Sequence, residues 1–257
     1  MVRPSTIVLA LWGLVAAVVS AVAVQTPAVD QPTQAVVQDG VPPSLPSRAH
    51  PAVLFIGDSY TQGVSTPDLS YGCMAATRLG WECNIAAQSA TGYVSGGPGN
   101  RLPAAEYGRA STSFVERLPR LHELYRADFV VLDGGRNDLQ FDMNAVMLAF
   151  SYTVTQVIDA WPNSRIVVIV PWFLADPVLR PGAFAGRTAG EEFAAALASS
   201  PTFAKVDLID PGALGWFVGA DVTRLTDDGI HPNFEGAKRI ADLLTAALIS
   251  GGVADPS

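Results

Sequence analysis

Ser59 is the residue of this chain that is best placed to act as a nucleophile. It follows the apolar run Val53–Ile56 through the short segment Gly57-Asp58-Ser59. A short apolar run bounded by glycine and aspartate is typical of a buried parallel strand, and open α/β sheets bind their ligands where such strands end. A serine there can attack a carbonyl carbon if a base takes its proton. The same residue types also begin helices, so a capping role for Ser59 is the alternative that this stretch leaves open.

Histidine is the commonest base for such a serine, and the chain contains three histidines. His50 lies in a proline-rich stretch, and His122 lies inside the segment 114–125, which has the pattern of a helix. His231 alone lies in a loop rich in Gly, Pro and Asp, with Asp228 three residues before it. His231 is therefore the best candidate for chemistry, and the alternative is a loop histidine that Asp228 merely caps.

The segments that must position these side chains alternate between apolar runs and helical patterns from residue 51 onward. This alternation predicts a parallel sheet whose strands are joined by right-handed helical crossovers. The expected strands are Val53–Ile56, Cys83–Ala87, Asp128–Asp133, Arg165–Val170 and Lys205–Ile209. One expected helix ends at Gly80, and the others are Phe114–Tyr125, Asn144–Trp161, Gly190–Ser199 and Phe234–Ile249.

Polar clusters follow three of these strands, and a fourth cluster precedes the last helix. They are Gly57-Asp58-Ser59, Ala90-Thr-Gly-Tyr93, Gly135-Arg-Asn137 and Asp228-Gly-Ile-His231. Their order and spacing resemble the four sequence blocks of the SGNH hydrolases, also called the GDSL esterase/lipase family, over about residues 51–250. The resemblance implies a flavodoxin-like, three-layer α/β/α fold with about five parallel strands in the order 2-1-3-4-5.

The same resemblance implies roles for the catalytic residues. Ser59 would be the nucleophile, His231 the general base, and Asp228 the acid that orients the imidazole. Asp227 is a neighbour that could replace Asp228, but the family spacing selects Asp228. Asp58 points away from its neighbour Ser59, so we interpret it as a structural hydrogen-bonding residue of the turn. The resemblance implies no metal and no organic cofactor.

An oxyanion needs hydrogen-bond donors, and the resemblance implies three: the backbone N–H groups of Ser59 and Gly92, and the side-chain amide of Asn137. The second block is the imperfect one. Gly92 fits the family pattern best, but a register in which Ala90 supplies the N–H is an alternative. A turn-capping role is the alternative for Asn137. The first block also departs from the family, with Tyr60 where many relatives carry Leu.

Three aromatic residues near the expected site are candidates for substrate binding. Trp172 and Phe173 follow the fourth expected strand, and Tyr93 lies beside Gly92. They would line an acyl pocket or stack on a sugar ring, and core packing is the alternative. The loop 89–112 is too long for a plain connector, which favours a binding role over a surface excursion. We expect a small-molecule, lipid or acylated-glycan ester as substrate.

Residues 1–23 are expected to be an export signal. Arg3 supplies the positive start, Ile7–Val24 is a weakly polar to apolar run, and Ala21-Val-Ala23 is typical of a cleavage site. The run is just long enough to be an uncleaved membrane anchor instead. Both interpretations place the rest of the chain outside the cytoplasm, either secreted or held at the cell envelope.

The two cysteines, Cys73 and Cys83, are closely spaced. In an exported protein such a pair favours a disulfide, here between the helix after the first strand and the start of the second strand. Two buried free thiols are the alternative. A zinc site is disfavoured because no histidine lies near the pair.

Composition excludes several classes of protein. The chain is 49% hydrophobic and 16% charged, which is not the composition of a disordered protein. Its length suffices for one sizeable domain, expected at 51–250 between a proline-rich flexible linker at 24–50 and a tail at 251–257. The formal charge of −8 and the lack of a basic patch argue against a nucleic-acid partner. We expect a monomer that contacts a membrane only if the leader stays uncleaved.

The expected function is that of a secreted serine esterase that cleaves carboxylic esters through an acyl-enzyme intermediate. An extracellular acyltransferase with the same site is one alternative, and the products formed with an added alcohol acceptor would separate the two. A binding module without turnover is the other alternative. The presence of Ser59, His231 and Asn137 favours turnover.

Overall fold

The computed structural model describes residues 49–63, 69–102, 110–179 and 186–255. The predicted export signal at 1–23 and nearly all of the predicted linker at 24–50 lie outside the described residues, so both stay predictions. Among the described residues, no helix is long and apolar enough to cross a membrane.

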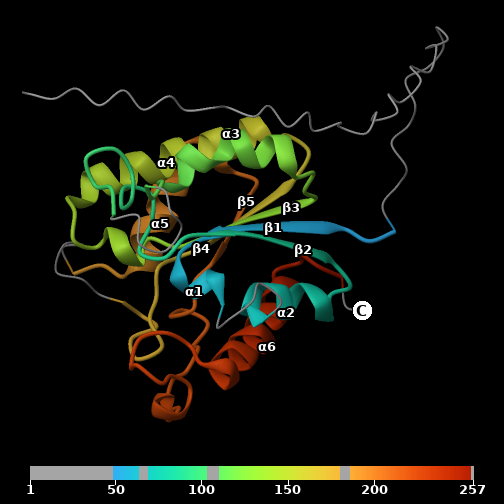
Figure 1. The fold of residues 1–257 in the computed structure, drawn as a ribbon, viewed down its shortest axis with the longest axis vertical. Coiled ribbons are helices and arrows are strands. Elements are labelled where there is room, and N and C mark those ends of the chain that lie inside the picture. The colour runs from blue at the N-terminus through green and yellow to red at the C-terminus, as the bar shows by residue number, and fades with distance from the viewer. Residues whose placement is uncertain (1–48, 64–68, 103–109, 180–185, 256–257) are drawn as a thin grey trace, which may run out of the picture. The chain divides into compact units, whose positions relative to one another are not determined.

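A parallel sheet of five strands lies at the centre of the domain, in the order β2-β1-β3-β4-β5. The strands are β1 (Ala52–Gly57), β2 (Glu82–Ala87), β3 (Phe129–Asp133), β4 (Arg165–Ile169) and β5 (Val206–Ile209). Every residue of β1 is buried, because this apolar strand is covered on both faces. The predicted fold class and strand order are confirmed (Figure 1).

Helices cover both faces of the sheet (Figure 1). On one face lie α3 (Phe114–Leu124), α4 (Met143–Ala160) and α5 (Ala189–Ala198). On the other face lie α2 (Tyr71–Arg78) and α6 (Phe234–Ser250), which contact each other. The three layers are therefore helices, sheet and helices.

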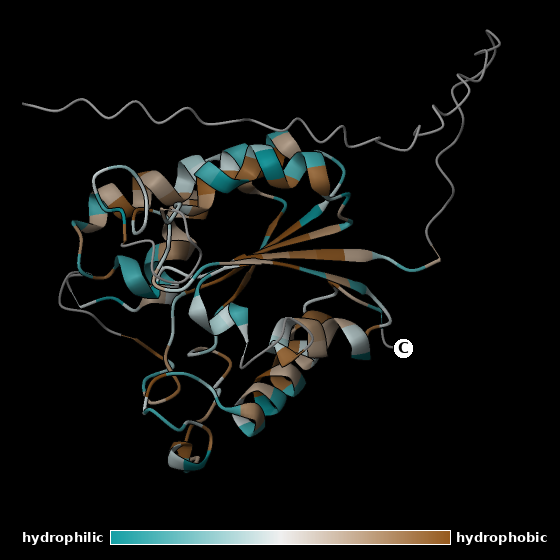
Figure 2. Ribbon diagram, viewed as in Figure 1, coloured by the Kyte–Doolittle hydropathy of each residue, from teal (hydrophilic) through white to brown (hydrophobic). Residues whose placement is uncertain are grey.

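Each face of the sheet has its own hydrophobic core, because successive side chains of a strand point to opposite faces. Val53 and Phe55 of β1 pack in the core beneath α2 and α6. Leu54 and Ile56 pack in the core beneath α3, α4 and α5. Figure 2 shows the resulting pattern, with hydrophobic strands between helices that carry hydrophilic residues on their outer sides.

The predicted elements differ from the observed ones mainly at their ends. Helix α4 begins one residue earlier than predicted, because the Asp142 side chain caps it by accepting the Ala145 N–H at 3.1 Å. Short 3-10 turns that were not predicted connect some elements. They are η2 (Arg136–Asp138), η4 (Pro201–Phe203) and η5 (Val222–Arg224).

Cys73 and Cys83 form a disulfide, which confirms the predicted pairing. The bond joins α2 to the second residue of β2, the edge strand of the sheet. The disulfide therefore ties the edge strand β2 to helix α2, and both elements pack on the same hydrophobic core.

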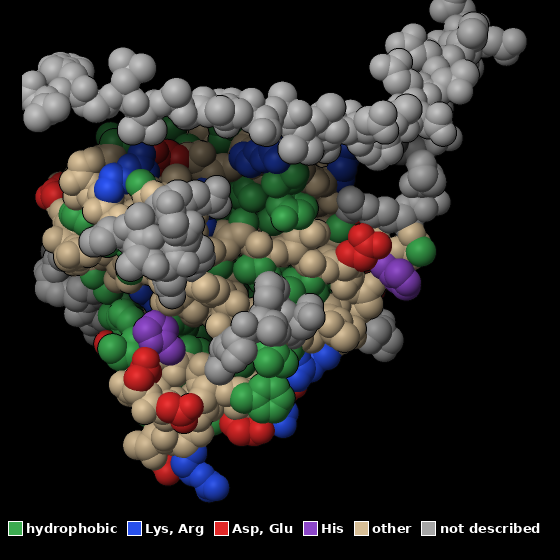
Figure 3. All heavy atoms as spheres, in the orientation of Figure 1, with side chains coloured by type: hydrophobic (Ala, Val, Ile, Leu, Met, Phe, Trp, Pro, Cys, Tyr) green, Lys and Arg blue, Asp and Glu red, His purple; other side chains and the backbone are tan. Residues whose placement is uncertain are grey.

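Charged side chains are dispersed over the face drawn in Figure 3. Lys and Arg occur there singly or in small groups, without a continuous basic patch on that face.

Candidate active site

Ser59 begins the short helix α1 (Ser59–Gln62) immediately after β1. Asp58, and not Ser59, caps this helix, because its Oδ1 accepts the Tyr60 N–H at 2.9 Å. Glycine is needed at position 57, since a Cβ there would lie 1.9 Å from Thr61 Oγ1. The tight turn leaves the half-buried Ser59 at the carboxyl edge of the sheet, and the structural interpretation of Asp58 is confirmed.

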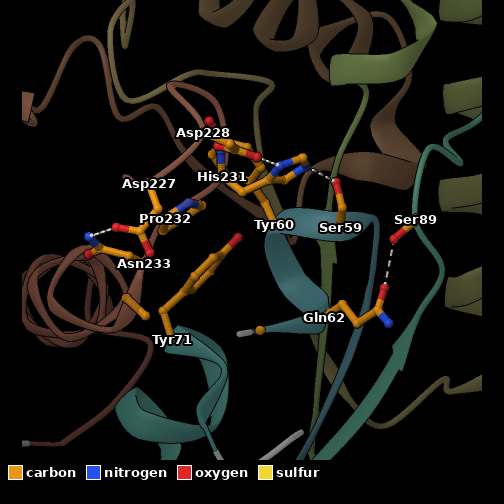
Figure 4. Close-up of a pocket in the computed structure, with 12 residues that line it drawn as sticks. Ser59, Tyr60, Gln62, Tyr71, Ser89, Asp227, Asp228, His231, Pro232 and Asn233 are labelled. Atoms are coloured by element: carbon orange, nitrogen blue, oxygen red, sulfur yellow. Dashed lines mark hydrogen bonds and ion pairs between the residues drawn. The ribbon is translucent and has the colours of Figure 1, made fainter. Parts of the chain in front are cut away.

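His231 lies between Ser59 and Asp228, which come from distant parts of the chain (Figure 4). Its Nε2 is 3.0 Å from Ser59 Oγ, and its Nδ1 is 2.6 Å from Asp228 Oδ2. Asp228 Oδ1 accepts the backbone N–H groups of Ile230 at 2.8 Å and His231 at 2.7 Å. The segment before α6 therefore presents an acid and a histidine to the end of β1.

The surroundings of Asp228 keep it ionised. The hydrogen bond from His231, followed by the backbone bonds from Ile230 and His231, holds the pKa of the Asp228 carboxyl well below its usual range. An ionised carboxylate only accepts hydrogen bonds, so His231 Nδ1 carries the proton that it donates. In the neutral imidazole, Nε2 is then an acceptor that faces the Ser59 hydroxyl.

A cleft of about 350 Å³ opens beside these residues (Figure 4). One wall carries Ser89, whose Oγ donates to Gln62 Oε1 at 3.0 Å. The opposite wall carries Asn233, whose Nδ2 donates to Asp227 Oδ1 at 3.0 Å. Asp227 thus belongs to the cleft wall and does not replace Asp228 beside the histidine. The full lining is Ser59, Tyr60, Gln62, Gly63, Tyr71, Ser89, Asp227, Asp228, His231, Pro232, Asn233 and Ala237.

Asn137 lies in η2, at the end of the neighbouring strand β3. Its Nδ2 donates to the Thr91 carbonyl oxygen at 3.0 Å and lies 3.4 Å from Asp58 Oδ2. The bond to Thr91 identifies the amide nitrogen, because the amide oxygen could not accept from a carbonyl. The second contact is long and joins Asn137 to Asp58, the residue before Ser59, so the Asn137 amide lies beside the turn that carries the nucleophile.

The expectation that the Gly92 N–H is free to bind an oxyanion is wrong. This N–H donates to the Ser95 carbonyl oxygen at 3.0 Å, and Gly92 is buried. Glycine is present for space, because a Cβ would lie 2.2 Å from Asp138 Oδ2. The alternative residue, Ala90, is exposed and has a positive φ of 58°, and its N–H has no acceptor within the described parts of the chain.

Asp138 fixes the loop that contains Ala90 and Gly92. Its buried carboxylate accepts the backbone N–H groups of Tyr93 at 2.7 Å, Val94 at 3.0 Å and Ser95 at 2.8 Å. Burial raises the pKa of Asp138, and these three bonds act against that rise. The role of Asp138 was not predicted, and the signal available in the sequence was an acidic residue directly after Asn137.

Arg136 and two carboxylates form a buried cluster behind Ser59. Arg136 Nη2 lies 3.2 Å from Asp58 Oδ1 and 3.0 Å from Asp133 Oδ1. Asp133 Oδ2 also accepts hydrogen bonds from the hydroxyls of Tyr71 and Thr61. Desolvation raises the pKa of Asp58 to about 6, although the Arg136 charge acts in the opposite direction. No pattern in the sequence indicates that these charges are buried together.

Two of the three predicted substrate-binding aromatics are core residues. Tyr93 is 2% exposed and packs among Phe114, Phe150 and Phe193, and Trp172 is 0% exposed. Both predictions are wrong, because these rings face the two hydrophobic cores and do not line the cleft. Phe173 is half-buried near the Tyr60 ring and is not among the lining residues of the cleft.

Comparison with known proteins gives one sequence family. Residues 55–239 match the sequence profile of the GDSL-like Lipase/Acylhydrolase family. No curated protein sequence matches the chain.

Several solved structures resemble the domain. A family two carbohydrate esterase from Clostridium thermocellum, in complex with cellohexaose, is 19% identical, with a TM-score of 0.55 over 80% of this chain and 66% of that chain. The carbohydrate acetylesterase Est24 from Sinorhizobium meliloti is 20% identical, with a TM-score of 0.53 over 78% and 99%. The aryl esterase from M. smegmatis is 20% identical, with a TM-score of 0.52 over 78% and 99%. At these identities the likeness shows a shared fold.

Proposed function

The chain belongs to the GDSL-like lipase/acylhydrolase family and is a serine hydrolase of ester bonds, and on this premise we propose that Ser59, His231 and Asp228 form its catalytic triad. The observation that carries the proposal is the position of His231, whose two ring nitrogens lie 2.6 Å from Asp228 Oδ2 and 3.0 Å from Ser59 Oγ.

In the proposed mechanism, Ser59 Oγ attacks the carbonyl carbon of the ester while His231 Nε2 takes the hydroxyl proton. The ionised Asp228 stabilises the imidazolium that forms. The tetrahedral intermediate then expels the alcohol, which receives the proton from His231. The acyl group remains on Ser59 until His231 deprotonates a water molecule, which attacks the acyl carbon. The second tetrahedral intermediate then releases the acid as His231 returns the proton to Ser59 Oγ.

We propose that the oxyanion of the tetrahedral intermediate binds to the backbone N–H groups of Ser59 and Ala90 and to Asn137 Nδ2. Ala90 replaces Gly92 in this role because the Gly92 N–H already donates to Ser95. Asn137 is suitable because a neutral amide donates a hydrogen bond without competing for the proton.

Hydrolysis is favoured over acyl transfer to a second alcohol by the exposure of the site. The side chains of His231 and Asp228 are 45% and 53% exposed, so water reaches the acyl-enzyme freely. A transferase must instead keep water away from that intermediate. Product analysis with an added alcohol acceptor checks this point, and we expect free acid as the main product.

The cleft supports a substrate with a short acyl group and a hydroxylated alcohol part. Among the described residues that line it, none is a Lys, Arg, Leu, Ile, Val or Met, and the two walls carry Ser89–Gln62 and Asp227–Asn233 pairs. Such pairs bind hydroxyl groups, whereas a long acyl chain needs an apolar channel. We therefore propose an acetylated carbohydrate as the substrate, because one similar structure is named a carbohydrate acetylesterase and another a carbohydrate esterase.

A series of p-nitrophenyl esters, from acetate to palmitate, tests this proposal together with acetylated oligosaccharides. We expect the parent protein to hydrolyse p-nitrophenyl acetate and the acetylated oligosaccharides. The Ser59→Ala variant should hydrolyse neither. A preference for palmitate contradicts the proposed substrate class, and equal turnover by Ser59→Ala contradicts the proposed triad.

We propose that residues 1–23 direct export. The Cys73–Cys83 disulfide supports this, because disulfides persist mainly outside the cytoplasm. Fractionation of the native host, with N-terminal sequencing, tests the proposal. A secreted chain that begins at residue 24 supports cleavage, an intact chain in the membrane fraction supports an anchor, and an intact chain in the cytoplasm contradicts export.

A further inference from the structure

The segment that carries Asp228 and His231 is exposed and has few contacts with the nucleophile. Ile230, between these two residues, is 53% exposed. The other hydrogen bonds of this segment join residues 224–236 to one another. Within the described part of the chain, two hydrogen bonds join 226–231 to residues outside 224–236. One is the contact between His231 and Ser59, and the other comes from Tyr60.

The Tyr60 hydroxyl donates to the Ile230 carbonyl oxygen at 2.5 Å. This carbonyl belongs to the peptide group that joins Ile230 to His231, so the bond acts on the backbone of the histidine itself. The Tyr60 and His231 rings are also neighbours, with centroids 5.9 Å apart. Because Tyr60 follows Ser59 directly in α1, one residue connects the nucleophile to the histidine segment.

The Tyr60 ring is held rigidly enough to serve this purpose. It is 3% exposed, the Arg136 guanidinium lies 4.4 Å from its centroid, and the Trp172 ring packs on it at 5.6 Å. Arg136 is fixed in turn by its ion pairs with Asp58 and Asp133. Because the Tyr60 side chain has so little freedom, its hydrogen bond to Ile230 holds the exposed segment at a fixed position relative to the edge of the sheet.

We propose that Tyr60 is a positioning residue that holds the His231 imidazole at Ser59. The proposal rests on the catalytic triad proposed above. Without the hydroxyl, the ring still fills its space, but the exposed segment loses the bond that fixes the Ile230–His231 peptide group. His231 Nε2 then spends less time within hydrogen-bond distance of Ser59 Oγ, which slows each step that needs the proton transfer.

The test compares Tyr60→Phe, Tyr60→4-aminophenylalanine and Tyr125→Phe in the full chain, with p-nitrophenyl acetate as substrate. The amino group restores a donor at the same place as the hydroxyl. Tyr125 is a half-buried tyrosine at the other end of the sheet, before β3, and controls for loss of a phenol hydroxyl. The rate at which a fluorophosphonate inactivates each protein reports on Ser59 reactivity without turnover, and melting temperatures report on the fold.

We expect Tyr60→Phe to lower kcat and the inactivation rate by about tenfold, which corresponds to the loss of one ordinary hydrogen bond, with KM nearly unchanged. The amino variant should recover most of both rates, and Tyr125→Phe should keep them. A Tyr60→Phe protein within twofold of the parent in kcat overturns the proposal, as does a loss that the amino variant does not recover. If Ser59→Ala keeps full activity, the triad itself fails and the positioning role fails with it.

Discussion

Asp58 and Arg136 form a buried ion pair directly behind the nucleophile, with Asp58 Oδ1 and Arg136 Nη2 3.2 Å apart and both side chains at most 2% exposed. Asp133 lies on the same guanidinium, so two carboxylates share one cation. Burial of Asp58 opposes its ionisation more strongly than Arg136 favours it, and its pKa rises to about 6. The turn that carries Ser59 is therefore built on a charged group that titrates near neutral pH.

The first prediction concerns the free energy of unfolding as a function of pH. A carboxyl whose pKa is raised from 3.8 to about 6 binds its proton more tightly in the folded chain. Its contribution to stability is fully present below pH 3.8 and is lost as the pH rises through 6, a change of about 3 kcal/mol.

Asp58→Asn should remove this part of the pH dependence, because the neutral amide takes the place of the protonated carboxyl and does not titrate. Denaturant titrations at intervals between pH 4 and 7 measure how the free energy of unfolding changes with pH in the parent and in the variant. An unaltered slope in the variant would show that Asp58 does not titrate in this range.

The second prediction concerns Asn137. Asn137→Ala should lower kcat by about 10²–10³-fold, because one donor to the proposed oxyanion is lost. Asn163→Ala, at an exposed turn at the other end of the sheet, is the matched control and should keep the kcat of the parent. Steady-state kinetics on p-nitrophenyl acetate distinguish the two variants. If kcat falls less than threefold in Asn137→Ala, Asn137 is not an oxyanion donor, and its role is the structural one of binding the Thr91 carbonyl.

The third prediction concerns Gly92 and Ala90, the two candidate oxyanion donors, and compares how a substitution at each changes the free energy of unfolding. Gly92→Ala should lower the free energy of unfolding by about 1–3 kcal/mol, because the new Cβ would lie 2.2 Å from Asp138 Oδ2. Ala90→Gly should raise it by up to about 1 kcal/mol, because Ala90 has a left-handed backbone with φ of 58°. Chemical denaturation measures both values, and the same sign of change in both variants would contradict this account of the loop.

The fourth prediction concerns the disulfide. Replacing both Cys73 and Cys83 by Ala should lower the free energy of unfolding by about 3 kcal/mol, the value expected for a cross-link across ten residues of sequence. The parent protein in reductant should lose the same amount, and the double variant should not respond to reductant. Two titratable thiols in the unreduced, denatured parent would show that the bond is absent.

The fold could be predicted from the sequence because its signals are local. The run Val53–Ile56 is apolar without interruption, as a strand covered on both faces must be. The four polar clusters also lie at or beside the edge of the sheet where they were expected. Order and spacing along the chain were sufficient for this, because the ends of parallel strands meet at one edge.

Other features depend on contacts between distant residues, which the sequence does not display. The aromatic side chains of Tyr93 and Trp172 have no pattern that separates a core position from a cleft position. The engagement of the Gly92 N–H depends on the way the loop folds back to Ser95. The cluster around Arg136 needs three charges to be buried together, and charged residues are ordinarily expected at the surface.

The most direct test of the central claim is to identify the residue that a fluorophosphonate modifies. The full chain is treated with the reagent, digested and analysed by peptide mass spectrometry, with His231→Ala treated in parallel. We predict one adduct per chain, on Ser59, and a strongly slowed reaction in His231→Ala, because its serine lacks the base 3.0 Å away. An adduct on a different serine, or full ester turnover after Ser59 is completely modified, would contradict the account.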